Sequence, residues 1–284
     1  MQARGFSGVT LMVLASAAFS AMSACVKALG PAFPFAEAVL VRALLGLPLL
    51  LLLARAQRVP LRMHRPALLL LRALLGFVGI SSLFFALQRA PLAIVTLLNR
   101  LQPLFVAMLA PWLLGERTAR STALVLLVSL AGTALVLRPA NAHFDLLVLV
   151  VLVGVVFSAL AHLAVRRLSA SDHPLLIVIA FSLVEILGGT AFSLGRFVVP
   201  SLPQWGLLIG TGLAGTAGQL LMTHAYVHDE APRVAAASYS SVVWALAIGY
   251  LVWRELPDPL ALLGGGLIVA AGLTLVLQGR PARR

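Results

Sequence analysis

The segment Gly132-Thr-Ala-Leu-Val-Leu137 is repeated almost unchanged later in the chain, as Gly272-Leu-Thr-Leu-Val-Leu277. Further pairs of matching residues follow a nearly constant offset of about 139 residues, which indicates an internal duplication. These pairs are Phe19 with Phe157, Pro34 with Pro174, Gly76 with Gly215, Gly79 with Gly218, Ala86 with Ala225, Pro91 with Pro232, and Glu116 with Glu255. The chain therefore contains two copies of one unit, which we expect at residues 1–140 and 141–284.

The composition is typical of a membrane protein. Hydrophobic residues make up 61% of the chain and charged residues 11%, and the mean hydropathy is +1.03. Apolar stretches of about 20 residues, long enough to cross about 30 Å of hydrocarbon as helices, recur along the whole length. They lie near residues 7–29, 34–54, 66–88, 91–114, 119–138, 144–165, 174–196, 203–227, 231–253 and 257–278. We predict an all-α integral membrane protein with ten transmembrane helices, five in each copy.

Basic residues gather in the loops on one side of this topology. Five helices per copy is an odd number, so the second copy enters the membrane in the opposite orientation, as an inverted repeat. Loops rich in Lys and Arg stay in the cytoplasm, so both termini are expected there, in a bacterial inner membrane. The richer side holds Arg4, Arg55, Arg58, Arg62, Arg65, Arg117, Arg120, Arg166, Arg167, Arg233, Arg280, Arg283 and Arg284, and the other holds Lys27, Arg89, Arg138, Arg196 and Arg254.

Several classes of function are disfavoured by the sequence. Cys25 is the single cysteine, which excludes an internal disulfide and a cysteine-based metal cluster, and we expect no cofactor and no metal. No catalytic motif and no nucleotide-binding loop is present, so we expect neither an enzyme nor an ATP-driven pump. The net charge of +12 lies at helix ends, so the expected partners are the lipid bilayer and a small-molecule solute rather than nucleic acid. The oligomeric state is left open.

Four ionisable residues lie far from the ends of the predicted helices: Arg42, Arg72, Arg100 and Glu185. Each costs roughly 2.5 to 3.5 kcal/mol at a helix centre, so such residues normally face a partner or a water-filled cavity. We expect Arg42 and Glu185 to form a charge pair, with Arg72 either part of this coupling group or directed to the cytoplasmic interface. The excess of positive charge suits a solute with a carboxylate or phosphate group.

Two polar quartets occupy equivalent places in the two copies. Asn99-Arg-Leu-Gln102 aligns with Ser238-Tyr-Ser-Ser241, and Pro103 weakens the helix after the first quartet. We expect both quartets to surround the solute, with Arg100 as the main anion contact; the alternative is a pair of hydrogen-bond clusters between helices. The full set of predicted binding residues is Asn99, Arg100, Gln102, Ser238, Tyr239, Ser241, Trp244, Ser81, Phe85, His162, Gln219 and His224.

The glycine pairs of the two copies are assigned to packing. Gly76 with Gly79, and Gly215 with Gly218, place small residues on one face of the third and eighth helices. Small residues at such a spacing let neighbouring helices approach closely in a membrane.

The sequence resembles the EamA-type branch of the drug/metabolite transporter superfamily along its whole length. The residues that carry the resemblance are Arg42, the junction from Phe85 to Pro91, Pro103, Leu114-Gly-Glu116, and the stretch from Tyr239 through Trp244 to Glu255 and Pro257. The resemblance implies ten helices, cytoplasmic termini, a central cavity between the two repeats, and alternating access without ATP. Similar family members move amino acids, nucleotide sugars, riboflavin or S-adenosylmethionine.

The expected function is secondary transport of a small polar metabolite, an amino acid or related organic acid, by alternating access. One alternative is a carrier for a larger aromatic or cationic metabolite such as riboflavin or S-adenosylmethionine, on which Tyr239 and Trp244 would stack. A channel or a non-transporting membrane scaffold is the alternative from another class. Polar residues gather near the middle of the predicted helices and leave apolar ends, which favours a carrier over a channel.

Overall fold

The computed structural model describes residues 7–30, 32–60, 62–87, 98–116, 118–137, 146–194, 197–254 and 258–277, and all regular structure within these ranges is helical. The first repeat contains α1 (Gly8–Leu29), α2 (Phe35–Ala56), α3 (Pro66–Leu87), α5 (Gln102–Leu114) and α6 (Arg120–Leu137). The second contains α7 (Leu146–Leu168), α8 (Pro174–Ser193), α9 (Leu202–His228), α10 (Ala231–Ala237), α11 (Ser240–Trp253) and α12 (Pro259–Leu277). The expected repeat boundary at residue 140 lies outside the described residues, as do Pro91 and Glu255.

These helices form ten membrane segments, as the hydropathy pattern predicts. Six segments are long and apolar enough to cross a membrane, with α10 and α11 together forming one of them, at Ala231–Val252. Three shorter apolar helices accompany them, at Gln102–Leu114, Arg120–Leu135 and Pro259–Thr274. The tenth segment is α9, which has 27 residues and contains the polar side chains of Gln219, Thr223 and His224. The all-α fold with ten helices is thereby confirmed.

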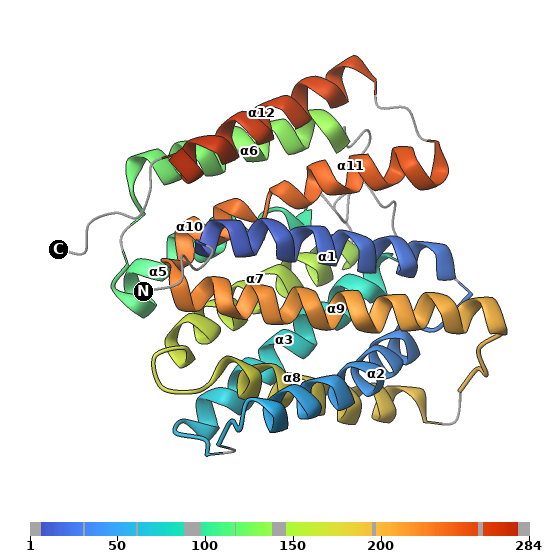
Figure 1. Ribbon diagram of the computed structural model, residues 1–284. Coiled ribbons are helices and arrows are strands. Elements are labelled where there is room, and N and C mark those ends of the chain that lie inside the picture. The colour runs from blue at the N-terminus through green and yellow to red at the C-terminus, as the bar shows by residue number, and fades with distance from the viewer. Residues whose placement is uncertain are drawn as a thin grey trace.

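The helix contacts follow a pseudo-two-fold relation between the repeats. The most extensive contacts are α1 with α9, α3 with α7, α2 with α8, and α6 with α12. Exchanging the two repeats converts the first of these pairs into the second and leaves the other two pairs unchanged. In Figure 1, α6 and α12 lie side by side at one edge of the bundle, and α2 and α8 lie at the opposite edge. The most extensive contacts inside the bundle therefore join the two repeats.

The fourth and ninth segments, each expected as one continuous helix, are interrupted. Residues 100–101 form a turn before α5, and residues 238–239 form a turn between α10 and α11. Pro103 explains the first interruption, because a proline in a helix removes a backbone donor. In the second, Ser238 Oγ donates to the carbonyl oxygen of Ala235 at 2.7 Å, and Ser241 Oγ donates to that of Ser238 at 2.6 Å. Serine hydroxyl groups thus compete with the helical hydrogen bonds at this interruption, which has no proline at the position that matches Pro103.

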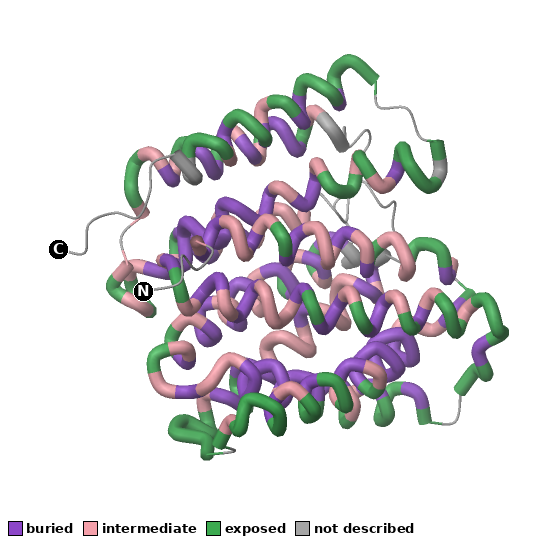
Figure 2. The backbone as a smooth tube through the Cα atoms, in the orientation of Figure 1, coloured by how far each residue is buried: buried purple, intermediate pink, exposed green. Residues whose placement is uncertain are grey.

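The outer surface of the bundle is apolar. Large side chains such as Trp112 and Leu202 are 84% and 86% exposed, and the exposed residues in Figure 2 lie mainly on the outer helix faces and at the ends. Such a surface is stable against lipid chains and not against water. The buried core runs through the middle of the bundle and includes Tyr226 and Met222.

The beginning of α1 and the end of α12 lie at the same end of the bundle (Figure 1). Most of the described basic residues in loops and at helix ends belong to this end, which we call the basic end. They are Arg55, Arg58, Arg62, Arg65, Arg120, Arg166, Arg167 and Arg233, whereas Lys27 and Arg254 belong to the opposite end.

A polar network ties several helices together at the basic end. Arg166 Nε, near the end of α7, donates to Glu116 Oε1 at 2.7 Å, and Arg166 Nη1 donates to the carbonyl oxygen of Tyr226 at 2.8 Å. The second carboxylate oxygen of Glu116 accepts from the backbone N–H of Ala231 at 2.7 Å. Burial and the negative charges of Glu116 and Asp229 raise the pKa of the neighbouring Glu230 carboxyl.

Candidate functional site

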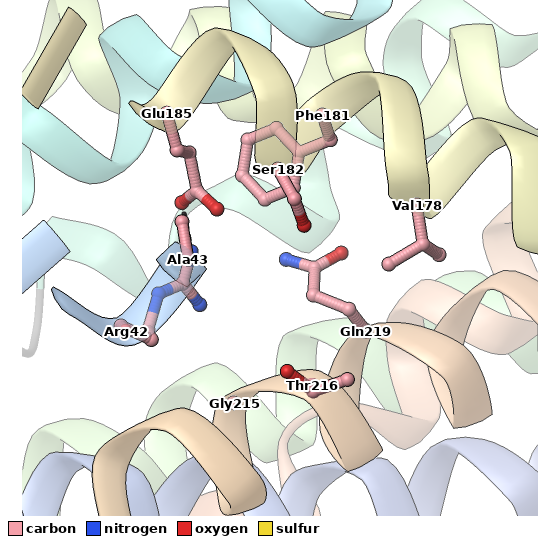
Figure 3. Close-up of a pocket in the computed structure, with 9 residues that line it drawn as sticks. All are labelled: Arg42, Ala43, Val178, Phe181, Ser182, Glu185, Gly215, Thr216 and Gln219. Atoms are coloured by element: carbon pink, nitrogen blue, oxygen red, sulfur yellow. Dashed lines mark hydrogen bonds and ion pairs between the residues drawn. The ribbon is translucent and has the colours of Figure 1, made fainter. Parts of the chain in front are cut away.

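A small cavity lies between α2, α8 and α9, and the Arg42–Glu185 pair forms part of its wall. The guanidinium of Arg42 donates to the carboxylate of Glu185, and both side chains are almost completely buried. Figure 3 shows Arg42 extending from α2 toward Glu185, with Gln219 extending from α9 toward Phe181 and Ser182. The lining residues are Arg42, Ala43, Val178, Phe181, Ser182, Glu185, Gly215, Thr216 and Gln219. The cavity has room for about one water molecule.

Arg72 contacts two residues of this lining from α3. Its Nη2 atom donates to Gln219 Oε1 at 3.2 Å, and its guanidinium carbon lies 4.2 Å from the centre of the Phe181 ring. Arg72 is 1% exposed, and its Nε and Nη1 atoms make no hydrogen bond within the described part of the chain. A buried guanidinium with free donors is costly unless another group satisfies them.

The guanidinium of Arg72 is buried and extends away from the basic end, unlike in the alternative that directs it to a membrane interface. Long side chains on helices usually lean toward the helix N-terminus, which for α3 lies at the basic end. Instead, Arg72 Nη1 lies beside Gly76, one turn deeper. A β-carbon added at Gly76 would be 2.8 Å from this nitrogen atom and 2.9 Å from Phe181 Cε2. Gly76 therefore makes space for the inward orientation.

The matched glycine of the second repeat has the same relation to the other arginine. A β-carbon at Gly215 would lie 3.0 Å from both Cδ and Nη1 of Arg42. The sequence pattern indicated close helix packing at these positions. Gly79 fits that interpretation, because a β-carbon there would clash with Ser158 Oγ on α7. Gly76 and Gly215, in contrast, each border a guanidinium group.

The two polar quartets meet at the helix interruptions. Tyr239 Oη donates to the backbone carbonyl oxygen of Arg100 at 2.8 Å, and Arg100 Nη1 donates to Ser241 Oγ. From α1, Ser20 Oγ donates to the carbonyl oxygen of Ser241 at 3.1 Å. Arg100 Nε makes no hydrogen bond among the described residues. Among the described residues, Arg100 thus has one neutral side-chain partner, and it lies at the junction of both repeats.

A further polar contact connects this junction with the Arg72 region. Gln102 Nε2, in the first turn of α5, contacts His162 Nδ1 on α7. The His162 ring stacks on Tyr226 at a centroid distance of 5.6 Å. Contacts of Gly79 with Ser158 show that α3 and α7 run past each other here, and Figure 1 shows them running in opposite directions. His162 lies one turn after Ser158 in α7, and Gly76 lies about one turn before Gly79 in α3. Because the two helices are antiparallel, His162 is level with Gly76 and the Arg72 guanidinium.

We call the group formed by these side chains the polar belt. It comprises Arg42, Arg72, Arg100, Gln102, His162, Glu185, Gln219, Tyr239 and Ser241. Glu185 is the one acidic side chain in it, against three arginines. Within the described ranges, no group of three or more His, Cys, Asp or Glu side chains is placed to hold a metal ion.

Six other predicted binding residues lie outside the belt. Trp244 is 37% exposed, and its Nε1 donates to the carbonyl oxygen of Val13 at 3.2 Å. Phe85 packs edge-on against Phe35 at 6.0 Å, and His224 lies beside His228 near the basic end. Ser81, in α3, and Asn99, in the turn before α5, are not among the residues that line the cavity.

Ser238 has a structural role next to the belt. Its hydroxyl group bonds within α10, and its carbonyl oxygen accepts from Ser16 Oγ on α1 at 3.5 Å. It supports the interruption of the ninth segment.

Phe181 belongs to the candidate site, although the sequence pattern did not indicate it. Its ring lies near two guanidinium groups, with the centroid 4.2 Å from the guanidinium carbon of Arg72 and 5.8 Å from that of Arg42. Its position one helical turn before Glu185 was the available signal, since residues four apart share a helix face. The uncharged Ser182 and Thr216 carried no comparable signal.

Comparison with known proteins agrees with this architecture. The pseudopaline exporter CntI of Pseudomonas aeruginosa is 37% identical over 271 residues, which cover 95% of each chain. An uncharacterized transporter of Helicobacter pylori is 28% identical, covering 95% of this chain and 94% of its own. An S-adenosylmethionine uptake transporter of Rickettsia bellii is 23% identical, with 78% and 76% covered.

A solved crystal structure superposes with a TM-score of 0.79 at 19% sequence identity, covering 95% of this chain and 96% of the other. This likeness supports the fold. The model of the EamA-like transporter family matches the chain twice, at residues 6–138 and 145–277. The relatives and the family are transporters and not enzymes. The chain is a multi-pass membrane transporter, and it belongs to the EamA-like transporter family.

Proposed function

We propose that this transporter is a secondary carrier for a small polar metabolite with a carboxylate group, an amino acid or related organic acid. The observation that carries the proposal is the charge of the polar belt. Arg42, Arg72 and Arg100 lie in it, and Glu185 is the single acid among the described residues of the belt. A positively charged interior attracts anionic groups and disfavours cations.

Alternating access fits the dimensions of the cavity. Space for about one water molecule cannot hold a metabolite, so the helices around the belt must separate when the solute binds. A channel needs a continuous polar path, and a central cavity with room for about one water molecule does not supply one. The inverted repeat offers a simple route to two such states, because the two halves can exchange conformations around a fixed central site.

The positive charge of the belt also favours one class of candidate solute over another. The relative in Rickettsia bellii is named for uptake of S-adenosylmethionine, a cation. Three guanidinium groups would repel such a solute, and Trp244, which would stack on its ring, lies at the outer surface. S-adenosylmethionine also has a carboxylate, so the charge of the belt discriminates by net charge. We therefore favour a carboxylate solute without net positive charge for this chain. We place the carrier in a bacterial inner membrane with the basic end on the cytoplasmic side.

Binding of matched solutes tests this function. The purified protein in detergent is heated with L-lactate, L-alanine and L-glutamate, each compared with its α-carboxamide. A ligand at 100 times its dissociation constant stabilises the folded state by about 2.7 kcal/mol, which shifts the unfolding temperature measurably. At least one acid should stabilise the protein more than its amide. Equal shifts for every acid and its amide would refute a carboxylate carrier.

A further inference from the structure

We propose that Arg72 binds the carboxylate group of the solute. The buried cluster of Arg42, Arg72 and Glu185 contains two positive charges and one negative charge, and the solute supplies the second negative charge. This inference rests on the carrier function proposed above and identifies the binding group within the polar belt. The sequence pattern favoured Arg100 for this role. Three features of the structure favour Arg72.

The first feature is the charge balance around the cavity. Arg42 and Arg72 both approach it, and Glu185 is the one acid among its described lining residues. Glu185 is already paired with Arg42. Around the cavity, α2 contributes Arg42 and α9 contributes the uncharged Thr216 and Gln219. From α3, Arg72 contacts Gln219 and Phe181 of this lining. The positive charge of Arg72 is therefore uncompensated, and one bound carboxylate would make the cluster neutral.

The second feature is the set of free donors on Arg72. Nη2 is bonded to the neutral amide of Gln219, while Nε and Nη1 have no partner among the described residues. Phe181 covers a face of the guanidinium plane, which leaves the N–H groups in the plane available. A carboxylate accepts charge-assisted hydrogen bonds from such donors. Arg100, in comparison, is only partly buried and bonds to Ser241. Among the described residues it has one buried donor without a partner, Nε, whereas Arg72 has two.

The third feature is the orientation of the side chain. Arg72 could satisfy its donors in the headgroup region at the basic end, as long basic side chains near helix ends do. Gly76 instead gives it space one turn deeper, where it lies level with His162. The side chain is thus held at the depth where a carrier binds its solute, without an acidic partner of its own.

This arrangement predicts opposite effects of one substitution on stability and on binding. Arg72→Met replaces the guanidinium with an apolar group of similar length. If Arg72 is an unsatisfied receptor, its removal should raise the midpoint of detergent-induced unfolding, because a buried unpaired charge disappears. The preference for an acid over its carboxamide, measured with L-lactate, L-alanine and L-glutamate, should fall by at least about tenfold in affinity. Arg72→Lys should recover part of the preference, because it restores the charge without the planar donors.

Arg62→Met is the matched control, since Arg62 is exposed at the basic end. It should change neither the unfolding midpoint nor the preference for acids. A lower midpoint or loss of folding in Arg72→Met would overturn the proposal and assign Arg72 to the structure. Unchanged preference in folded Arg72→Met would overturn it as well, while the carrier function would stand. If the unmodified protein does not distinguish any acid from its amide, the proposed function itself fails.

Discussion

The Arg42–Glu185 pair offers a quantitative test of how charge is arranged inside the bundle. Both side chains are at most 4% exposed, and removing one partner of a buried pair typically costs about 3–5 kcal/mol. Substitution of Glu185 and substitution of Arg42 should differ in their effect on stability, because a second arginine, Arg72, lies close to Arg42. The guanidinium carbons of Arg42 and Arg72 lie 5.8 Å and 4.2 Å from the Phe181 ring centre, hence at most about 10 Å apart.

At that separation, and with an effective dielectric constant of about 20, two positive charges repel each other by about 1.7 kcal/mol or more. Glu185→Gln leaves both arginines without an acid, so this repulsion adds to the loss of the pair. Arg42→Gln removes one of the repelling charges. We expect Glu185→Gln to be more destabilising than Arg42→Gln by about 1–2 kcal/mol. The double substitution should be less destabilising than Glu185→Gln alone.

The free energy of unfolding is measured by titrating SDS into mixed micelles of the purified protein and following tryptophan fluorescence. Arg62→Gln, at an exposed position, is the control for the loss of one positive charge. The interaction energy from the double-mutant cycle should be at least about 2 kcal/mol. Additive effects of the two single substitutions, or a larger effect of Arg42→Gln, would refute the reasoning.

Three further predictions concern packing, pH and topology. Gly76→Ala should lower the free energy of unfolding by about 1–3 kcal/mol in the same titration, because the added β-carbon meets Arg72 and Phe181. Gly206→Ala is the control and should not lower it, because a β-carbon at Gly206 meets no neighbour. Equal effects of the two substitutions would contradict this packing. The pKa of the Glu230 carboxyl is raised in the folded protein, so ionisation of this group destabilises the fold as pH rises above the ordinary value of 4.5. Glu230→Gln should therefore raise the unfolding midpoint at pH 7 and not near pH 4. A midpoint difference that does not change with pH would contradict this prediction. Reporter fusions at Arg284 and within residues 139–143 should lie on opposite sides of the membrane, with Arg284 in the cytoplasm, and a same-side result would overturn the topology.

The sequence was sufficient to predict the fold because its signals are local and repeated. Apolar stretches give the helices, and the matched residues from Phe19 with Phe157 to Gly132 with Gly272 give the duplication. The interruption near Arg100 follows from Pro103. Its counterpart near Ser238 did not follow, because Val242 occupies the position that matches Pro103 and the interruption depends on serine hydroxyl groups bonding to backbone carbonyls.

The candidate site was only partly predictable, because side-chain direction depends on neighbours from other helices. The depth of Arg72 in its helix was readily counted, yet its inward orientation depends on Gly76 and on the Phe181 ring of α8. Trp244 shares a helix with Ser241 but faces outward to Val13. Charge and spacing indicated which residues are costly to bury, and packing decided which of them meet.

The contact between Arg100 and Tyr239 has a consequence for how such a chain can arise. These residues occupy matched positions in the two repeats and touch each other through the Tyr239 hydroxyl. A position that touches its own counterpart lies on the pseudo-two-fold axis. In a pair of identical five-helix chains, symmetry would place the same side chain on both sides of that axis, and two arginines there would repel each other. Once the two copies are joined in one gene, the two residues at the axis can differ. An arginine in one repeat can then lie opposite a tyrosine in the other.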